Sequence, residues 1–140
     1  MEYSPYKNFT DSPSIDFMIS GDARRYYPEH IWSNPFPLKA AMSVSIQPGE
    51  RLLIPTGLFF AIPIGYAGFV TIAPELANQG LLCVNAPGLI DCQYRGEIRV
   101  IMQNCATSGS LTISRGVQLG IMAIRPTTSL EMEFLKCQNG

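Results

Sequence analysis

The residues best placed to do chemistry lie between Gly88 and Ile98, where an apolar run ends on a carboxylate and an aromatic ring follows. Asp91 closes the run that begins at Gly88, and Tyr94 stands three residues later, ahead of a second β-branched run. Two strands around a tight connection would bring Asp91 and Tyr94 together at a small-molecule pocket. One carboxylate in a partly apolar pocket is the minimal requirement for a general base. The spacing equally fits a plain β-hairpin in which Asp91 caps a polar turn.

The rest of the chain from Ala41 onward must supply the strands that position these residues. Short runs rich in Val, Ile, Leu and Thr alternate with Gly and Pro, and no helical face of useful length interrupts them. Strands this short at regular spacing predict an all-β sandwich, jelly roll or barrel. The predicted strands are Met42–Ile46, Arg51–Pro55, Leu58–Ile62, Phe69–Ile72, Leu81–Val84, Gly88–Ile90, Arg99–Gln103, Ser110–Ile113, Val117–Ile124 and Leu130–Phe134.

Residues 1–37 differ from residues 38–140, which form the β domain. They lack any sustained period of 2 or 3.6, and their prolines forbid a long helix. The segment is nevertheless too aromatic for a disordered tail. We therefore predict an extended arm whose rings pack against its own barrel, a neighbouring subunit or a foreign protein such as a capsid surface. The rings expected to make this contact are Tyr3, Tyr6, Phe9, Phe17, Tyr26, Tyr27 and Trp32.

Length and composition restrict the class of protein. At 140 residues with 15% charged residues and a net charge of −1, the chain is one domain without a basic patch for nucleic acid. No apolar stretch approaches the ~20 residues of a membrane-spanning helix, and the first residues do not resemble a secretion signal. The four cysteines form no Cys-x-x-Cys pair, and one histidine cannot build a zinc cluster, so free thiols and no metal site are expected.

The segment Gly-Leu-Ile-Asp-x-x-Tyr-Arg-Gly-Glu-Ile from Gly88 resembles the third sequence motif of the trimeric dUTPases. Pro48-Gly49-Glu50-Arg51, Pro55-Thr56-Gly57-Leu58 and Pro63-x-Gly65-Tyr66-x-Gly68 follow the order and spacing of that family, over roughly Phe36 to Pro126. The resemblance implies a homotrimeric jelly roll. It also implies that Asp91 orients a water molecule, that Tyr94 packs on deoxyribose, and that Gly88 and Ile90 belong to the substrate site.

Other motifs of the family are altered. The first motif carries Pro37 where the family has an aspartate that supports the metal and phosphate end. The second has Glu75 near the place of an arginine and serine that hold phosphate, which reverses the local charge. The fourth keeps its strand around Gln118–Met122 but not its arginine and glutamine, and the glycine-rich closing arm of the family is expected to be missing.

These losses lead to the expectation of a non-catalytic dUTPase-fold module. It would be a viral structural or interaction protein, for example in capsid decoration or host-partner binding. It would reside in the virion or the infected cytoplasm, would not be secreted, and would need no cofactor. The alternative is a divergent dUTPase that hydrolyses dUTP to dUMP and pyrophosphate with Mg²⁺. In that case Asp91 would act with Arg24, Arg25 or Arg115 as phosphate ligands. A third possibility is a sensor that binds nucleotide without hydrolysis.

Overall fold

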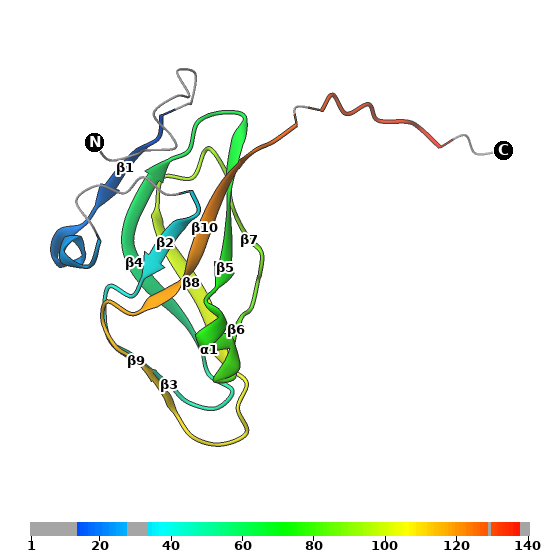
Figure 1. Ribbon diagram of the computed structural model, residues 1–140. Coiled ribbons are helices and arrows are strands. Elements are labelled where there is room, and N and C mark those ends of the chain that lie inside the picture. The colour runs from blue at the N-terminus through cyan, green and yellow to red at the C-terminus, as the bar shows by residue number, and fades with distance from the viewer. Residues whose placement is uncertain (1–13, 28–33, 129, 138–140) are drawn as a thin grey trace.

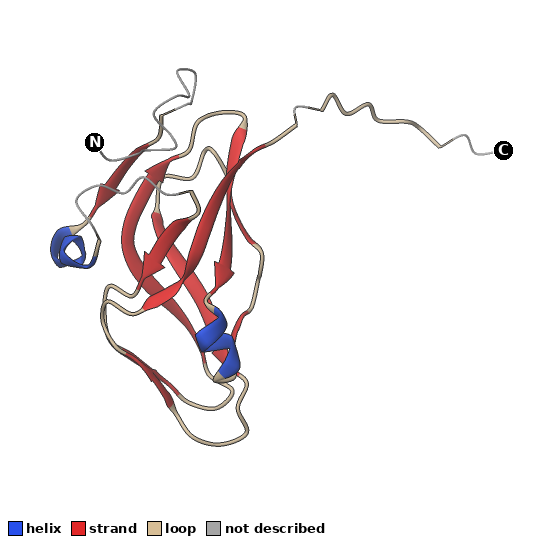
Figure 2. Cartoon of the chain, in the orientation of Figure 1, coloured by secondary structure: helices blue, strands red, loops and turns tan. Residues whose placement is uncertain are grey.

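Two four-stranded sheets pack face to face in the computed structural model, which describes residues 14–27, 34–128 and 130–137 (Figure 1). One sheet has the strand order β1-β4-β8-β6, the other has the order β2-β10-β5-β7, and β3 pairs with β9 at one end. Strands dominate the chain, with one short α-helix and one 3-10 helix (Figure 2). The expected all-β, dUTPase-like jelly roll is confirmed.

The bounds of the elements follow the predicted runs closely in the β domain. They are β1 Asp16–Ile19, η1 Gly21–Tyr26, β2 Phe36–Lys39, β3 Val44–Ile46, β4 Arg51–Ala61, β5 Tyr66–Ile72, α1 Pro74–Asn78, β6 Leu81–Cys83, β7 Gly88–Ile90, β8 Glu97–Asn104, β9 Leu111–Ile113 and β10 Gln118–Pro126.

Alternation along the strands places the core between the two sheets. In β8 the side chains of Ile98, Val100 and Met102 are buried, whereas Arg99 and Ile101 between them face outward. The side chains of Val100 and Met102 therefore point into the barrel of their own chain. The period of two is what a strand with one buried face requires.

β4 is one strand, although the sequence predicts two strands separated by Thr56-Gly57. A bulge in its pairing with β8 falls between Pro55 and Phe59, and Gly57 adopts a φ of +73° inside it. The buried hydroxyl of Thr56 donates to the carbonyl oxygen of Ile98 at 2.6 Å. The side chain thus replaces hydrogen bonds that the bulge takes from the ladder, and the strand continues.

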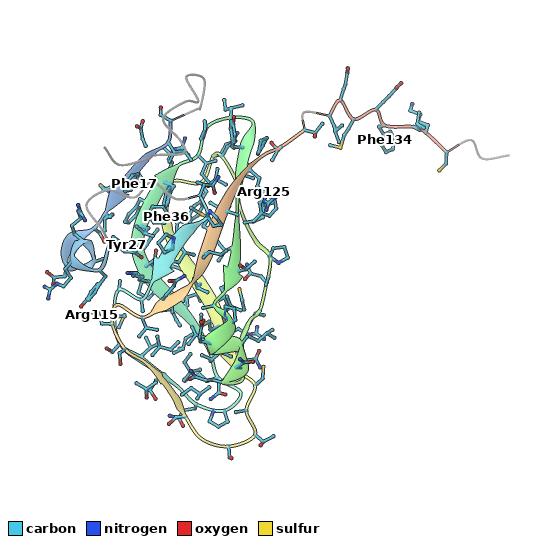
Figure 3. All side chains as sticks on the ribbon, in the orientation of Figure 1. Phe17, Tyr27, Phe36, Arg115, Arg125 and Phe134 are labelled. Carbon is cyan, nitrogen blue, oxygen red and sulfur yellow. The ribbon has the colours of Figure 1, made fainter. Side chains whose placement is uncertain are left out.

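The segment before the β domain packs on the chain's own barrel where the structure describes it. β1 pairs with β4, so that Phe17 lies opposite Phe60 and the two rings stack at 5.7 Å. Phe17 and Tyr27 gather around the buried ring of Phe36 (Figure 3). β2 crosses the predicted boundary between residues 37 and 38. Of the predicted contact residues, Tyr3, Tyr6, Phe9 and Trp32 lie outside the described residues.

After β10 the chain leaves the barrel, and residues 130–137 form no strand, so the predicted strand Leu130–Phe134 is wrong. The segment extends away from the sheets (Figure 1), with Phe134 far from the core (Figure 3). Its large apolar side chains are 76–91% exposed. Within the part of the chain that the structure describes, no helix is long and apolar enough to cross a membrane.

Candidate functional site

Asp91 and Tyr94 lie in a turn that passes from one sheet to the other. The amide N–H of Tyr94 donates to the carbonyl oxygen of Asp91 at 3.0 Å, which closes the turn. β7 before the turn pairs with β5, whereas β8 after it pairs with β4 and β6. The hairpin interpretation is therefore wrong, because the two strands do not pair with each other. We call residues 91–96 the crossover turn.

The ring of Tyr94 is fixed by contacts within the crossover turn. Its hydroxyl donates to the carbonyl oxygen of Glu97 at 2.7 Å, and the side chain remains 43% exposed. A Cβ at Gly96 would lie 2.7 Å from the Tyr94 hydroxyl oxygen, so the close approach of the ring depends on glycine. With the hydroxyl engaged, the ring offers its apolar faces to a ligand.

Glu97 holds the crossover turn against β4. One carboxylate oxygen accepts a hydrogen bond from the amide of Gly57 at 3.1 Å, and the other lies 3.6 Å from the guanidinium of Arg99. In the sequence, Gly57 and Glu97 stand out only as parts of motifs. The hydrogen bond between them joins residues 40 positions apart in the sequence. A local sequence pattern cannot predict a contact between residues so far apart in the chain.

The predicted substrate residues Gly88 and Ile90 are both on β7, which is an edge strand of its sheet. Gly88 is buried, Ile90 is half-buried, and Asp91 beyond them is exposed. An edge strand has backbone N–H and C=O groups on its outer side that a ligand can use. The exposed carboxylate and the half-exposed ring therefore follow an edge strand directly in the chain.

A separate groove of about 580 Å³ lies between α1 and β10. Its polar side chains are Thr71, Glu75, Gln79 and Gln118. Glu75 makes no ion pair among the described residues. The volume of the groove is in the range of ligand pockets. The one charged side chain in its lining, Glu75, is negative.

β2 borders the groove through its pairing with β10. Pro37 lies opposite Ile121, and Lys39 lies opposite Gln118. Phe36 and Leu38 are buried while Pro37 and Lys39 are half-buried, so Pro37 and Lys39 share the outward face. Proline is tolerated there because β2 is an edge strand and needs hydrogen bonds on one side only.

The crossover turn and the groove lie at opposite ends of β5 in one chain. Ile90 pairs with Gly68 near the beginning of β5, so Asp91 lies beyond that end. α1 follows Ile72 at the other end, as Figure 1 shows. A ligand that used both features would therefore need a second copy of the chain.

The three arginines proposed as phosphate ligands lie at neither place. Arg24 donates to the carbonyl oxygen of Tyr27 at 2.9 Å, and Arg25 pairs with Asp22 at 3.4 Å in η1. Arg115 follows β9, and its backbone amide donates to the hydroxyl of Ser43. Figure 3 shows Arg115 on the side of the barrel near η1.

Two groups have a raised pKa, and neither lies in the crossover turn or the groove. Burial raises the pKa of Tyr27 to about 12, against an opposing hydrogen bond from the backbone of Lys39. Burial also raises the pKa of the Cys83 thiol, against an opposing backbone hydrogen bond from Asn85. Both groups are therefore protonated and neutral at pH 7, which suits structural positions.

The described residues contain no group of three or more His, Cys, Asp or Glu side chains that could enclose a metal ion. Mg²⁺ is commonly held by one or two carboxylates together with substrate phosphates and water, rather than by a protein cage. The lining of the groove contains one carboxylate, that of Glu75, and the amide and hydroxyl oxygens of Gln79, Gln118 and Thr71. These donors fit Mg²⁺ that arrives with a phosphate ligand.

The comparisons with known proteins agree on one family. Residues 33–136 match the family model for dUTPase. A protein named deoxyuridine 5'-triphosphate nucleotidohydrolase from Rhizobium leguminosarum bv. trifolii is 39% identical over 93 residues, covering 66% of this chain and 59% of that protein. A protein of the same name from Aquifex aeolicus is 42% identical over 103 residues, covering 71% and 68%. The chain thus spans less than two thirds of the length of the first relatives.

Solved structures agree with the fold. A mutant dUTPase of Staphylococcus aureus phage phi11 superposes with a TM-score of 0.75 at 19% identity, covering 91% of this chain and all of the other. A mutant dUTPase of staphylococcal phage 80alpha gives a TM-score of 0.76 at 18% identity, covering 92% of this chain. At these identities the likeness establishes the architecture alone.

The expectation of a non-catalytic interaction module is corrected by these relatives. Proteins 39–45% identical to the chain are all named as nucleotidohydrolases, and the expected capsid or host partner has no support among them. The substitutions at Pro37 and Glu75 remove particular ligands. They leave the acid and the ring of the crossover turn in place, so they do not establish a loss of activity. By its sequence and its fold, the chain belongs to the dUTPase family.

Proposed function

We propose that the chain hydrolyses dUTP to dUMP and pyrophosphate. The observation that carries the proposal is the crossover turn, in which an exposed carboxylate and an aromatic ring held by its hydroxyl follow directly on the edge strand β7. Relatives named deoxyuridine 5'-triphosphate nucleotidohydrolase support the substrate.

Each group of the crossover turn has a role in this reaction. Asp91 accepts a proton from water and directs the water oxygen at a phosphorus atom. The Tyr94 ring packs on the deoxyribose, where a 2'-hydroxyl would meet an apolar face and lose its hydration. Backbone groups on the outer edge of β7, near Gly88 and Ile90, hydrogen-bond the uracil base.

We further propose that the active unit is a homotrimer, as is typical of the family. The separation of the crossover turn from the groove supports this assembly, because two copies can bring the two features together. Outward-facing apolar side chains of the β1-β4-β8-β6 sheet support it as well. Leu53 is 58% exposed and Leu82 is 51% exposed, and such exposed apolar surface is typical of an interface.

The test is pyrophosphate release from dUTP by the full chain in Mg²⁺, with UTP and dCTP as competing substrates. We expect turnover of dUTP in preference to both. Asp91→Asn should reduce kcat roughly 10²–10⁴-fold, because that is the usual contribution of a general base. The matched control is Asp16→Asn, an exposed carboxylate on β1, which should leave kcat unchanged. Absence of dUTP turnover in the wild-type protein would overturn the proposal.

A further inference from the structure

Glu97 connects the ring of Tyr94 to β4 through two hydrogen bonds. Its backbone carbonyl oxygen accepts the hydrogen bond of the Tyr94 hydroxyl at 2.7 Å. Its carboxylate accepts a hydrogen bond from the amide of Gly57 at 3.1 Å, and its side chain is 19% exposed. A hydrogen bond from an amide to a carboxylate is stronger than one between neutral groups. The position of the ring therefore depends on how firmly Glu97 is attached to β4.

The bulge of β4 is the reason that a side chain makes this attachment. The pairing of β4 with β8 is interrupted between Pro55 and Phe59, and Phe59 is the residue that lies opposite Glu97. A bulge leaves backbone groups outside the ladder, and a buried backbone group without a partner is costly. The Gly57 amide lies in this interruption, and the Glu97 carboxylate is its acceptor. Without the carboxylate the amide loses this partner, and the beginning of β8 loses an attachment to β4.

The other side of Gly57 is held by the segment before the β domain. The carbonyl oxygen of Gly57 accepts a hydrogen bond from the amide of Ser20 at 2.8 Å. The buried side chain of Ala23 packs so closely that a Cβ at Gly57 would collide with it. The Gly57 amide is therefore a fixed donor for the Glu97 carboxylate. This support comes from residues 14–27, which precede the residues 33–136 that match the family model.

We propose that Glu97 is a positioning residue that determines the discrimination between dUTP and UTP by holding the ring of Tyr94 in place. The inference rests on the proposed function, in which the apolar face of this ring meets the sugar. A ring that cannot move leaves a 2'-hydroxyl no room to keep its hydration, and the loss of hydration is costly. A ring that can shift admits the hydroxyl together with water. Glu97 thus acts on the sugar through Tyr94, whereas the base is bound at β7.

The experiment measures two ratios of kcat/KM with the full chain in Mg²⁺, for dUTP over UTP and for dUTP over dCTP, each from one competition reaction. In Glu97→Ala the dUTP/UTP ratio should fall roughly 10- to 100-fold, because small displacements of a positioning group have effects of this size. The dUTP/dCTP ratio should keep its wild-type value, because the base is bound elsewhere. Partial unfolding would lower all three rates and leave both ratios unchanged, and a generally distorted site would lower both ratios.

Two conservative variants test the hydrogen bond itself, and they decide the question even if Glu97→Ala does not fold. Glu97→Gln retains an oxygen that can accept from the Gly57 amide, so its dUTP/UTP ratio should be close to that of the wild type. Glu97→Asp keeps the charge but is shorter by one methylene group, so it should lose the Gly57 amide and the discrimination with it. The matched control is Glu50→Ala, whose lost carboxylate accepts the amide of Gln47 at 3.0 Å in an exposed turn. It should leave both ratios unchanged.

A double-mutant cycle tests whether Glu97 acts through Tyr94. Tyr94→Phe removes the hydroxyl that donates to Glu97 and should itself lower the dUTP/UTP ratio. Since both substitutions release the same ring, Glu97→Ala should have little further effect in the Tyr94→Phe protein. Additive effects would overturn the inference, as would a wild-type dUTP/UTP ratio in Glu97→Asp, an equal loss in Glu97→Gln and Glu97→Asp, or a parallel fall of both ratios.

The two proposals fail in different ways. If wild-type protein turns over dUTP while the Glu97 variants keep its preference over UTP, the role of Glu97 is wrong and the activity stands. The same holds if wild-type protein turns over dUTP and UTP equally well. If wild-type protein turns over no dUTP, the proposed function fails and the role of Glu97 fails with it.

Discussion

Tyr27 offers a direct test of how the segment before the β domain is held. Its side chain is 4% exposed, and its hydroxyl oxygen lies 3.1 Å from the carbonyl oxygens of both Lys39 and Thr56. The hydroxyl also accepts a hydrogen bond from the Lys39 amide at 2.9 Å. Tyr27→Phe keeps the ring but leaves these buried backbone groups without a partner, at a cost of about 1–3 kcal/mol in the free energy of unfolding at pH 7.

The same hydroxyl gives the effect a pH dependence. Burial raises the pKa of Tyr27 to about 12, whereas an unfolded tyrosine titrates near pH 10. Because the folded pKa is the higher one, the stabilisation is fully present below about pH 10 and is lost as the pH rises toward about 12. The loss is on the order of 3 kcal/mol in all. Phenylalanine has no such titration, so the advantage of the wild type over Tyr27→Phe should shrink above pH 10.

The assay is urea unfolding followed by circular dichroism between pH 7 and pH 11. Protomer concentration must be constant, because the stability of an oligomer depends on it. Tyr66→Phe is the matched control, since that half-buried hydroxyl makes no hydrogen bond with the residues that the structure describes. Equal unfolding midpoints for wild type and Tyr27→Phe at pH 7, with parallel curves at alkaline pH, would refute the buried hydrogen-bond network.

Three further substitutions test the bulge, the crossover turn and a buried amide. Gly57→Ala should lower stability by at least ~1–2 kcal/mol in thermal unfolding, because φ is +73° and the new Cβ would collide with Ala23. Gly96→Ala would press on the Tyr94 hydroxyl and should raise KM for dUTP several-fold, with the fold retained by circular dichroism. Asn104→Ala removes an amide that is 0% exposed and makes three hydrogen bonds, so about 1–3 kcal/mol should be lost in urea unfolding.

The sequence predicts the strands of the β domain well, because the pattern of each strand is set by residues that are close together in the chain. The alternation in β8 and the turn residues between strands depend on neighbours in the chain. The first two strands escape prediction for the opposite reason. β1 is an edge strand whose residues are mostly exposed, and its partners Leu58–Ala61 lie some 40 residues away. β2 contains Pro37, which argues against a strand until the strand is known to be an edge.

The residues of the candidate site are likewise predictable only in part. Asp91 and Tyr94 can be identified from residue types and spacing. The role of Glu97 cannot, because its partner Gly57 is distant in the chain. Whether β7 and β8 form a hairpin depends on which sheet each strand joins, and a tight turn fits either answer. The missing motif residues alone do not decide the function, because the loss of one ligand does not show which other group takes its place.

The structure also gives a physical reason why the crossover turn kept its residues while the groove changed. Tyr94 and Glu97 have contacts that the fold itself uses, so replacing them disturbs β4 and β8 as well as the ligand. Glu75, Gln79 and Gln118 are exposed at the groove and can be exchanged with little effect on the core, since surface substitutions usually change stability by less than about 0.5 kcal/mol. A reversal of charge at Glu75 should therefore cost the fold little, whereas a change at Tyr94 or Glu97 would break hydrogen bonds that hold the crossover turn.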